Sequence, residues 1–70
     1  MEIRLSYHAR KRMLERGIKF EQIRETLEMP EYSIVKESKK ELYKKINNKI
    51  LKVVCVEKDN YINVITLMWK

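Results

Sequence analysis

Two kinds of hydrophobic spacing divide the chain at its single proline, Pro30. Before Pro30 the apolar residues recur every three or four positions, which predicts helices. After it they alternate with polar residues, which predicts strands. A short alternating run at Ile3–Leu5 adds a brief edge strand. The predicted order is one strand, two helices and then a sheet of three to four antiparallel strands, an α+β fold in a single domain over residues 1–70.

The first helix is predicted over residues 7–16, a run that contains neither Gly nor Pro. Ser6 suits its N-cap position, because a serine hydroxyl can accept a hydrogen bond from an unpaired N–H of the first turn. Gly17 suits the left-handed residue that follows the last turn. A second helix is predicted over residues 20–27, and the short link between the two favours an antiparallel helical hairpin.

Four strands are predicted after Pro30, at residues 32–35, 41–46, 50–56 and 61–69. Asn47–Asn48 suits a two-residue hairpin turn, because asparagine tolerates positive φ. With this turn Leu42 lies opposite Val53, and Tyr43 lies opposite Lys52. One sheet face is then apolar, and we expect the two helices to cover it. Its predicted members are Leu42, Ile46, Leu51, Val53, Cys55, Ile62, Val64, Thr66 and Met68.

The opposite sheet face mixes lysines and aromatic rings with apolar side chains, and no predicted element remains to cover it. Its predicted members are Tyr43, Lys45, Ile50, Lys52, Val54, Asn63, Ile65, Leu67 and Trp69. An exposed apolar patch of this size usually marks a partner surface. Lysines beside rings suit phosphate contact and base stacking. We therefore expect nucleic acid to be the first partner to consider for this face.

The charge of the chain agrees with this expectation. Lys and Arg number 16 against 10 Asp and Glu, which gives a formal charge of +6. Such an excess attracts polyanions, although a solvated Lys- and Glu-rich surface is the alternative. The length excludes a two-domain enzyme, and the single cysteine excludes a disulfide framework or a cysteine-built zinc site. We expect no metal, no cofactor, no membrane partner and a cytoplasmic location.

Two segments carry a resemblance to known protein families. Residues 8–18, HARKRMLERGI, continued by residues 20–23, FEQI, are similar to the opening signature of a small family of uncharacterised domains. Residues 43–54, YKKINNKILKVV, followed by residues 62–66, resemble the sheet of the same family. The chain also resembles the BrnT toxins, and both groups are similar to the RelE/ParE-like toxin superfamily. The resemblance implies a RelE-like order of elements for nearly the whole chain.

The same resemblance implies a metal-independent ribonuclease or a degenerate relative of one. RNA, free or at the ribosome, is then the substrate, and a cognate antitoxin is the partner. RelE-like nucleases place cations and an acid/base group on the sheet face away from the helices. On this chain the implied residues are Lys45 and Lys52 for phosphate charge, Tyr43 as a hydrogen-bonding or acid group, and Trp69 as a base-stacking platform.

The first helix adds further candidates, because His8 shares a helix face with Arg12 and Glu15. Histidine changes protonation near neutral pH, so His8 joins Tyr43 and Lys52 as a candidate catalytic residue. A first-turn residue that only bonds to its neighbours is the alternative. Arg12 and Arg16, one turn apart, form either a phosphate-binding stripe or a solvated face paired with Glu15.

We therefore expect a toxin-like, RNA-directed protein. Two other classes stay open. A non-catalytic nucleic-acid-binding module is favoured by Asn63 and Met68, which stand where BrnT-like sequences carry arginines. A protein-interaction domain, which includes a homodimer, would use the same uncovered sheet face.

Overall fold

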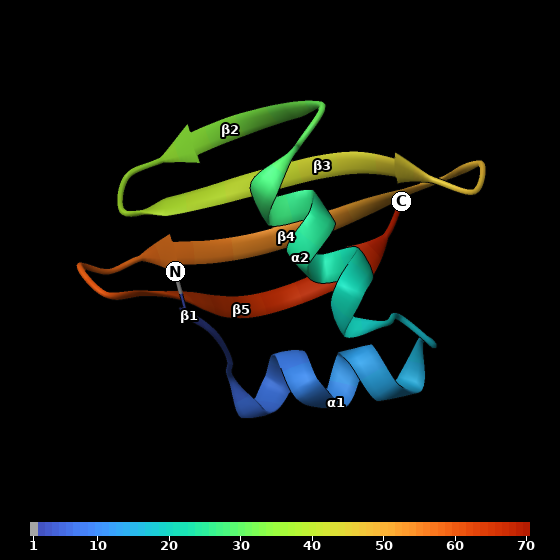
Figure 1. Ribbon diagram of the computed structural model, residues 1–70, viewed down its shortest axis with the longest axis horizontal. Coiled ribbons are helices and arrows are strands. Elements are labelled where there is room, and N and C mark those ends of the chain that lie inside the picture. The colour runs from blue at the N-terminus through green and yellow to red at the C-terminus, as the bar shows by residue number, and fades with distance from the viewer. Residues whose placement is uncertain (1) are drawn as a thin grey trace.

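The computed structural model describes residues 2–70 as a five-stranded sheet with two helices against it (Figure 1). The elements are β1 (Glu2–Leu5), α1 (Tyr7–Glu15), α2 (Phe20–Glu28), β2 (Tyr32–Lys36), β3 (Lys39–Ile46), β4 (Lys49–Glu57) and β5 (Tyr61–Trp69). The predicted α+β order is confirmed, and every strand after Pro30 lies within two residues of its predicted bounds. No helix within residues 2–70 is both long enough and apolar enough to span a bilayer.

Both predicted end signals of α1 are confirmed. The Ser6 hydroxyl accepts a hydrogen bond of 3.0 Å from the Ala9 N–H. At the other end Gly17 has a φ of 63°, and the Ile18 N–H donates to the Met13 carbonyl at 3.0 Å. This is the Schellman arrangement, which satisfies carbonyls that the last turn leaves free. The chain then turns into α2, which runs back across β3 and β4 (Figure 1).

The sheet order is β1-β5-β4-β3-β2, with β1 parallel to β5 and the other pairs antiparallel. The Asn47–Asn48 turn has positive φ at both residues, 52° and 69°, as a two-residue hairpin of this kind requires. The predicted register of β3 and β4 is confirmed: Leu42 pairs with Val53, and Tyr43 pairs with Lys52.

The hydrophobic core lies between the helices and one face of the sheet. Its buried members are Ala9, Ile18, Ile23, Leu42, Leu51, Val53, Cys55, Val64 and Leu67. No helix within residues 2–70 packs on the opposite side, which we call the open face (Figure 1). The alternation of side chains along a strand therefore decides which residues are buried and which form an outer surface.

A β-bulge in β5 changes this alternation. Cys55 pairs with Val64, whereas its neighbour Val54 pairs with Thr66, so Ile65 is an extra residue without an opposite partner on β4. A bulge of one residue exchanges the two faces for every position beyond it. The predicted faces hold only for a strand without a bulge.

The predicted faces were therefore wrong for the last residues of β5. Thr66 and Met68 lie on the open face, while Leu67 and Trp69 lie on the core face. Trp69 packs against the core, and its indole N–H donates to the Arg16 carbonyl at 3.2 Å. The expectation that Trp69 offers a stacking platform on the open face is thus corrected, because the bulge turns its ring toward α1.

Substitutions at two residues with positive φ test how local backbone conformation contributes to stability. These residues are Gly17, with a φ of 63°, and Glu37, with a φ of 52° in the turn between β2 and β3. A Cβ at Gly17 meets no heavy atom within 4 Å, so Gly17→Ala should lower the free energy of unfolding by about 1 kcal/mol through strain alone. Glu37→Gly should raise it by about 0.5 kcal/mol, since relieved strain exceeds the entropy lost with glycine.

Urea unfolding followed by Trp69 fluorescence measures both changes. Ser38→Gly is the control, because φ at Ser38 is not positive, and it should destabilise the protein. Equal signs for Gly17→Ala and Glu37→Gly would contradict the strain argument.

Candidate nucleic-acid interface

Opposed side chains form two rows across strands β2 to β5 on the open face. The first row is Tyr32, Tyr43, Lys52 and Met68. The second row is Ile34, Glu41, Val54 and Thr66. Lys45 is exposed on the same face, opposite Ile50. The open face therefore brings together three of the residues predicted for the site: Tyr43, Lys45 and Lys52.

Glu41 holds the centre of this face through three polar contacts. The Tyr43 hydroxyl donates to Glu41 Oε1 at 3.0 Å. Lys36 Nζ lies 3.4 Å from Oε2, and Lys52 Nζ lies 3.8 Å from Oε1. The side chains of Glu41 and Lys52 are only 14% and 19% exposed, against 64% for Lys36. We call Lys36, Glu41, Tyr43 and Lys52 the Glu41 cluster.

These contacts shift two pKa values in opposite directions. The hydrogen bond from Tyr43, with help from Lys36 and Lys52, holds the pKa of Glu41 below its ordinary value, although partial desolvation opposes the shift. Desolvation, followed by the hydrogen bond to Glu41, raises the pKa of Tyr43. At neutral pH Glu41 is therefore a carboxylate, and Tyr43 is a neutral hydrogen-bond donor.

The rings of Tyr32 and Tyr43 are stacked, with centroids 4.5 Å apart and planes 11° from parallel. On the β4 side Lys52 Nζ lies 5.8 Å from the Tyr43 ring centroid. Tyr43 is only 5% exposed, whereas Tyr32 is 54% exposed. Although Tyr43 lies on the open face, its neighbours cover it, so its ring offers little surface to a ligand.

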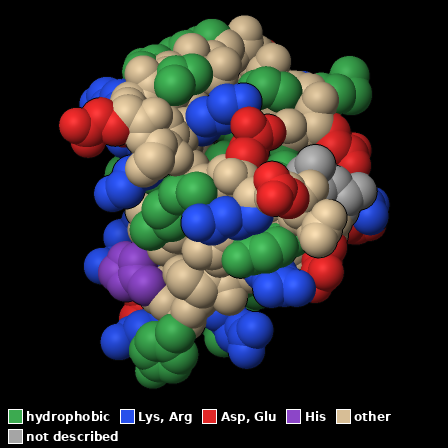
Figure 2. All heavy atoms as spheres, turned by 90° about the vertical axis from the view of Figure 1, so that its left-hand side faces the viewer, with side chains coloured by type: hydrophobic (Ala, Val, Ile, Leu, Met, Phe, Trp, Pro, Cys, Tyr) green, Lys and Arg blue, Asp and Glu red, His purple; other side chains and the backbone are tan. Residues whose placement is uncertain are grey.

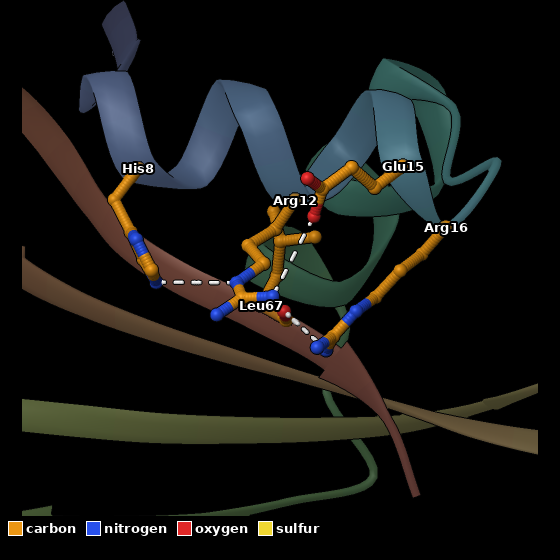
Figure 3. A network of polar contacts seen from close by, with 5 residues as sticks. All are labelled: His8, Arg12, Glu15, Arg16 and Leu67. Carbon is orange, nitrogen blue, oxygen red and sulfur yellow. Dashed lines mark hydrogen bonds and ion pairs between the residues drawn. The ribbon is translucent and has the colours of Figure 1, made fainter.

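The candidates on α1 form a second polar group (Figure 3). Arg12 Nε donates to His8 Nε2 at 3.3 Å, and Arg12 Nη1 lies 3.5 Å from Glu15 Oε1. Arg16 Nη1 donates to the Leu67 carbonyl at 3.4 Å, and the His8, Arg12 and Arg16 side chains leave the helix toward β5. The predicted shared face of His8, Arg12 and Glu15 is therefore confirmed.

The structure does not bring the three predicted catalytic residues into one constellation. No polar contact within residues 2–70 joins His8 to Tyr43 or Lys52. Helix α1 packs on β5 and β1, whereas Tyr43 and Lys52 lie on β3 and β4. The predicted trio therefore divides between α1 and the centre of the sheet.

Glu41 was not among the predicted site residues, although a signal for it was present. It stands two residues before Tyr43 on the same strand, and side chains at this spacing share a face. The predicted register therefore already placed Glu41 beside Tyr43, diagonal to Lys52.

One end of the sheet carries the β2–β3 and β4–β5 turns, and its surface mixes charged and hydrophobic side chains. Figure 2 shows Lys and Arg side chains interleaved with hydrophobic and acidic ones over this end. The described residues 2–70 contain no pocket. They also contain no group of three His, Cys, Asp or Glu side chains placed to hold a metal ion.

Fold and surface together define a small basic α+β domain whose sheet carries lysines and tyrosines on an uncovered face. The sequence profile of a family described as a domain of unknown function, DUF4258, matches residues 5–69, and the chain belongs to this family. No curated protein and no solved structure matches the chain.

Glu41→Gln tests the electrostatics of the Glu41 cluster. Because folding lowers the pKa of Glu41, the unfolded chain takes up the proton first as pH falls. The stability that the Glu41 charge supplies is therefore fully present above the unfolded pKa of about 4.3 and is lost as pH falls further. We expect wild type to exceed Glu41→Gln in free energy of unfolding at neutral pH, and the difference to shrink below about pH 4.3.

Urea titrations between neutral and acid pH measure that difference. Glu31→Gln removes the same charge at an exposed position outside the Glu41 cluster and is the matched control. A Glu41→Gln difference that stays constant with pH would show that the charge of Glu41 does not stabilise the fold.

Proposed function

We propose that this chain is a toxin-like, RNA-directed protein that binds RNA through the open face of its sheet. The observation that carries the proposal is the exposed ring of Tyr32, which stacks on Tyr43 in one row with Lys52, on a face that neither helix covers. Rings and lysines in one surface match the two parts of RNA, its bases and its phosphates.

The charges of this face support an anionic ligand. On the open side of β2, β3 and β4 there are four lysines and one carboxylate: Lys36, Lys39, Lys45, Lys52 and Glu41. The whole chain carries a formal charge of +6. Such a field raises the rate at which a polyanion reaches the surface.

The sequence resemblance supports the toxin-like part of the proposal. One strand, two helices and four strands is the order that a RelE-like protein is expected to have, and it is the order observed here. An antitoxin that neutralises such a protein would cover the open face, where RNA is proposed to bind.

Metal-independent RNA cleavage is a second candidate function, and the Glu41 cluster is the observation that favours it. In this proposal the Glu41 carboxylate takes the proton of a 2′-hydroxyl, whose oxygen attacks the neighbouring phosphorus. Lys36 and Lys52 stabilise the charge on the phosphate oxygens. The 5′ oxygen leaves with a proton from Lys52, which gives a 2′,3′-cyclic phosphate and a 5′-hydroxyl end.

Lys52→Ala tests binding. We expect several-fold weaker binding of a single-stranded RNA oligonucleotide, because one phosphate contact is lost. The slope of log K against log salt should also decrease in magnitude by about 0.7. Fluorescence anisotropy at a series of salt concentrations measures both values. Lys58→Ala, in the turn between β4 and β5, removes the same charge elsewhere and should leave both nearly unchanged. Equal binding by Lys52→Ala and wild type would exclude Lys52 from the interface.

Incubation of RNA with wild type and Glu41→Gln in the presence of EDTA tests cleavage. Loss of the general base should slow cleavage by at least about 100-fold, and substitution of a 2′-deoxy nucleotide at the cleaved position should block it. Binding without cleavage by wild type would identify a non-catalytic module. Cleavage that survives in Glu41→Gln would place the chemistry elsewhere.

A further inference from the structure

The stacked tyrosines end at the border of the sheet. Tyr32 belongs to β2, the last strand in the sheet order. One face of its ring lies against Tyr43, and no described strand lies beyond the other face. Tyr32 is 54% exposed, about ten times the fraction of Tyr43. The stack therefore presents one open ring face, at the edge of the open face.

The chemistry around this ring is suited to a planar, anionic ligand. The stack runs from Lys52 through Tyr43 to Tyr32, so a flat ring placed on Tyr32 would continue it. Lys36 lies on the same face of β2, and its side chain is 64% exposed. Its ammonium group contacts Glu41 at 3.4 Å and remains accessible to a phosphate beside the stacked ring.

We propose that the open ring face of Tyr32 is a stacking site for an unpaired nucleobase, with Lys36 in contact with the adjoining phosphate. This inference rests on the proposed function and adds the class of RNA that the face selects. In a duplex each base is stacked between its own neighbours and paired at its edge, so it has no face free for Tyr32. The protein therefore prefers single-stranded RNA to duplex RNA.

Binding of three ligands by wild type and Tyr32→Leu tests the inference. The ligands are a single-stranded RNA oligonucleotide, the same sequence as a duplex, and a strand of equal length with abasic sites. Wild type should bind the single strand most tightly, and Tyr32→Leu should weaken that binding about tenfold. The abasic strand should bind wild type and Tyr32→Leu equally, because it offers phosphates without bases.

Two control variants isolate the ring. Tyr32→Phe keeps the aromatic face and should bind as wild type does. Tyr7→Leu removes an exposed tyrosine from α1 and should have no effect. NMR of the wild type needs no substitution at the site: ring protons of Tyr32 should shift upfield when the oligonucleotide binds, while those of Tyr7 should not.

The outcomes separate this inference from the proposed function. If Tyr32→Leu binds the single strand as wild type does, or if duplex and single strand bind equally well, the stacking site is wrong while RNA binding stands. If wild type binds no RNA, both are wrong. If Tyr32→Leu instead dissolves a dimer seen by sedimentation, the Tyr32 face belongs to a contact with a second copy, and the stacking site is overturned.

Discussion

The hydrogen bonds of Ser6 are the contacts on which the division of β5 between the core face and the open face depends. The Ser6 hydroxyl accepts a hydrogen bond from the Ala9 N–H at 3.0 Å and donates one to the Ile65 carbonyl at 2.9 Å. The Ser6 N–H also donates to the Val64 carbonyl at 3.0 Å. The residue that starts α1 is therefore bonded to the bulge of β5, and the bulge decides that Thr66 and Met68, instead of Leu67 and Trp69, complete the open face.

The other end of α1 is bonded to β5 as well, so the helix caps partly cover the edge of β5 where β1 no longer pairs with it. Strand β1 pairs with β5 only as far as Val64. Beyond that point the Ile65 and Leu67 carbonyls accept hydrogen bonds from Ser6 and Arg16, and Trp69 donates to the Arg16 carbonyl. The side chains of Ser6 and Arg16, the two caps of α1, thus satisfy two backbone carbonyls that a further strand would otherwise pair. Part of the guanidinium of Arg16 is engaged in this structural role.

Whether a feature could be predicted from the sequence depends on how far apart in the chain the interacting residues lie. The helix ends and the Asn47–Asn48 hairpin are local, so the register of Tyr43 and Lys52 could be derived from neighbouring residues alone. The bulge could not, because residues 62–69 are largely apolar at both odd and even positions, and alternation then carries no information on a one-residue shift. The separation of His8 from Tyr43 and Lys52 depends on where α1 packs, which is a long-range property. Glu41 is a different case, since the correct register already placed it beside Tyr43.

The contacts that keep Glu41 ionised in the free protein also make it a weaker base. RNA bound to the Glu41 cluster would reverse this effect. In the free protein the contacts with Tyr43, Lys36 and Lys52 lower the pKa of Glu41, which keeps it ionised but makes it a weaker base. A phosphate bound by Lys36 and Lys52 would draw these ammonium groups toward itself and add a negative charge nearby. Both changes raise the pKa of a carboxylate. In the proposed mechanism RNA binding would therefore strengthen the base at the place where the 2′-hydroxyl arrives, and cleavage would depend on the same lysines that bind the RNA.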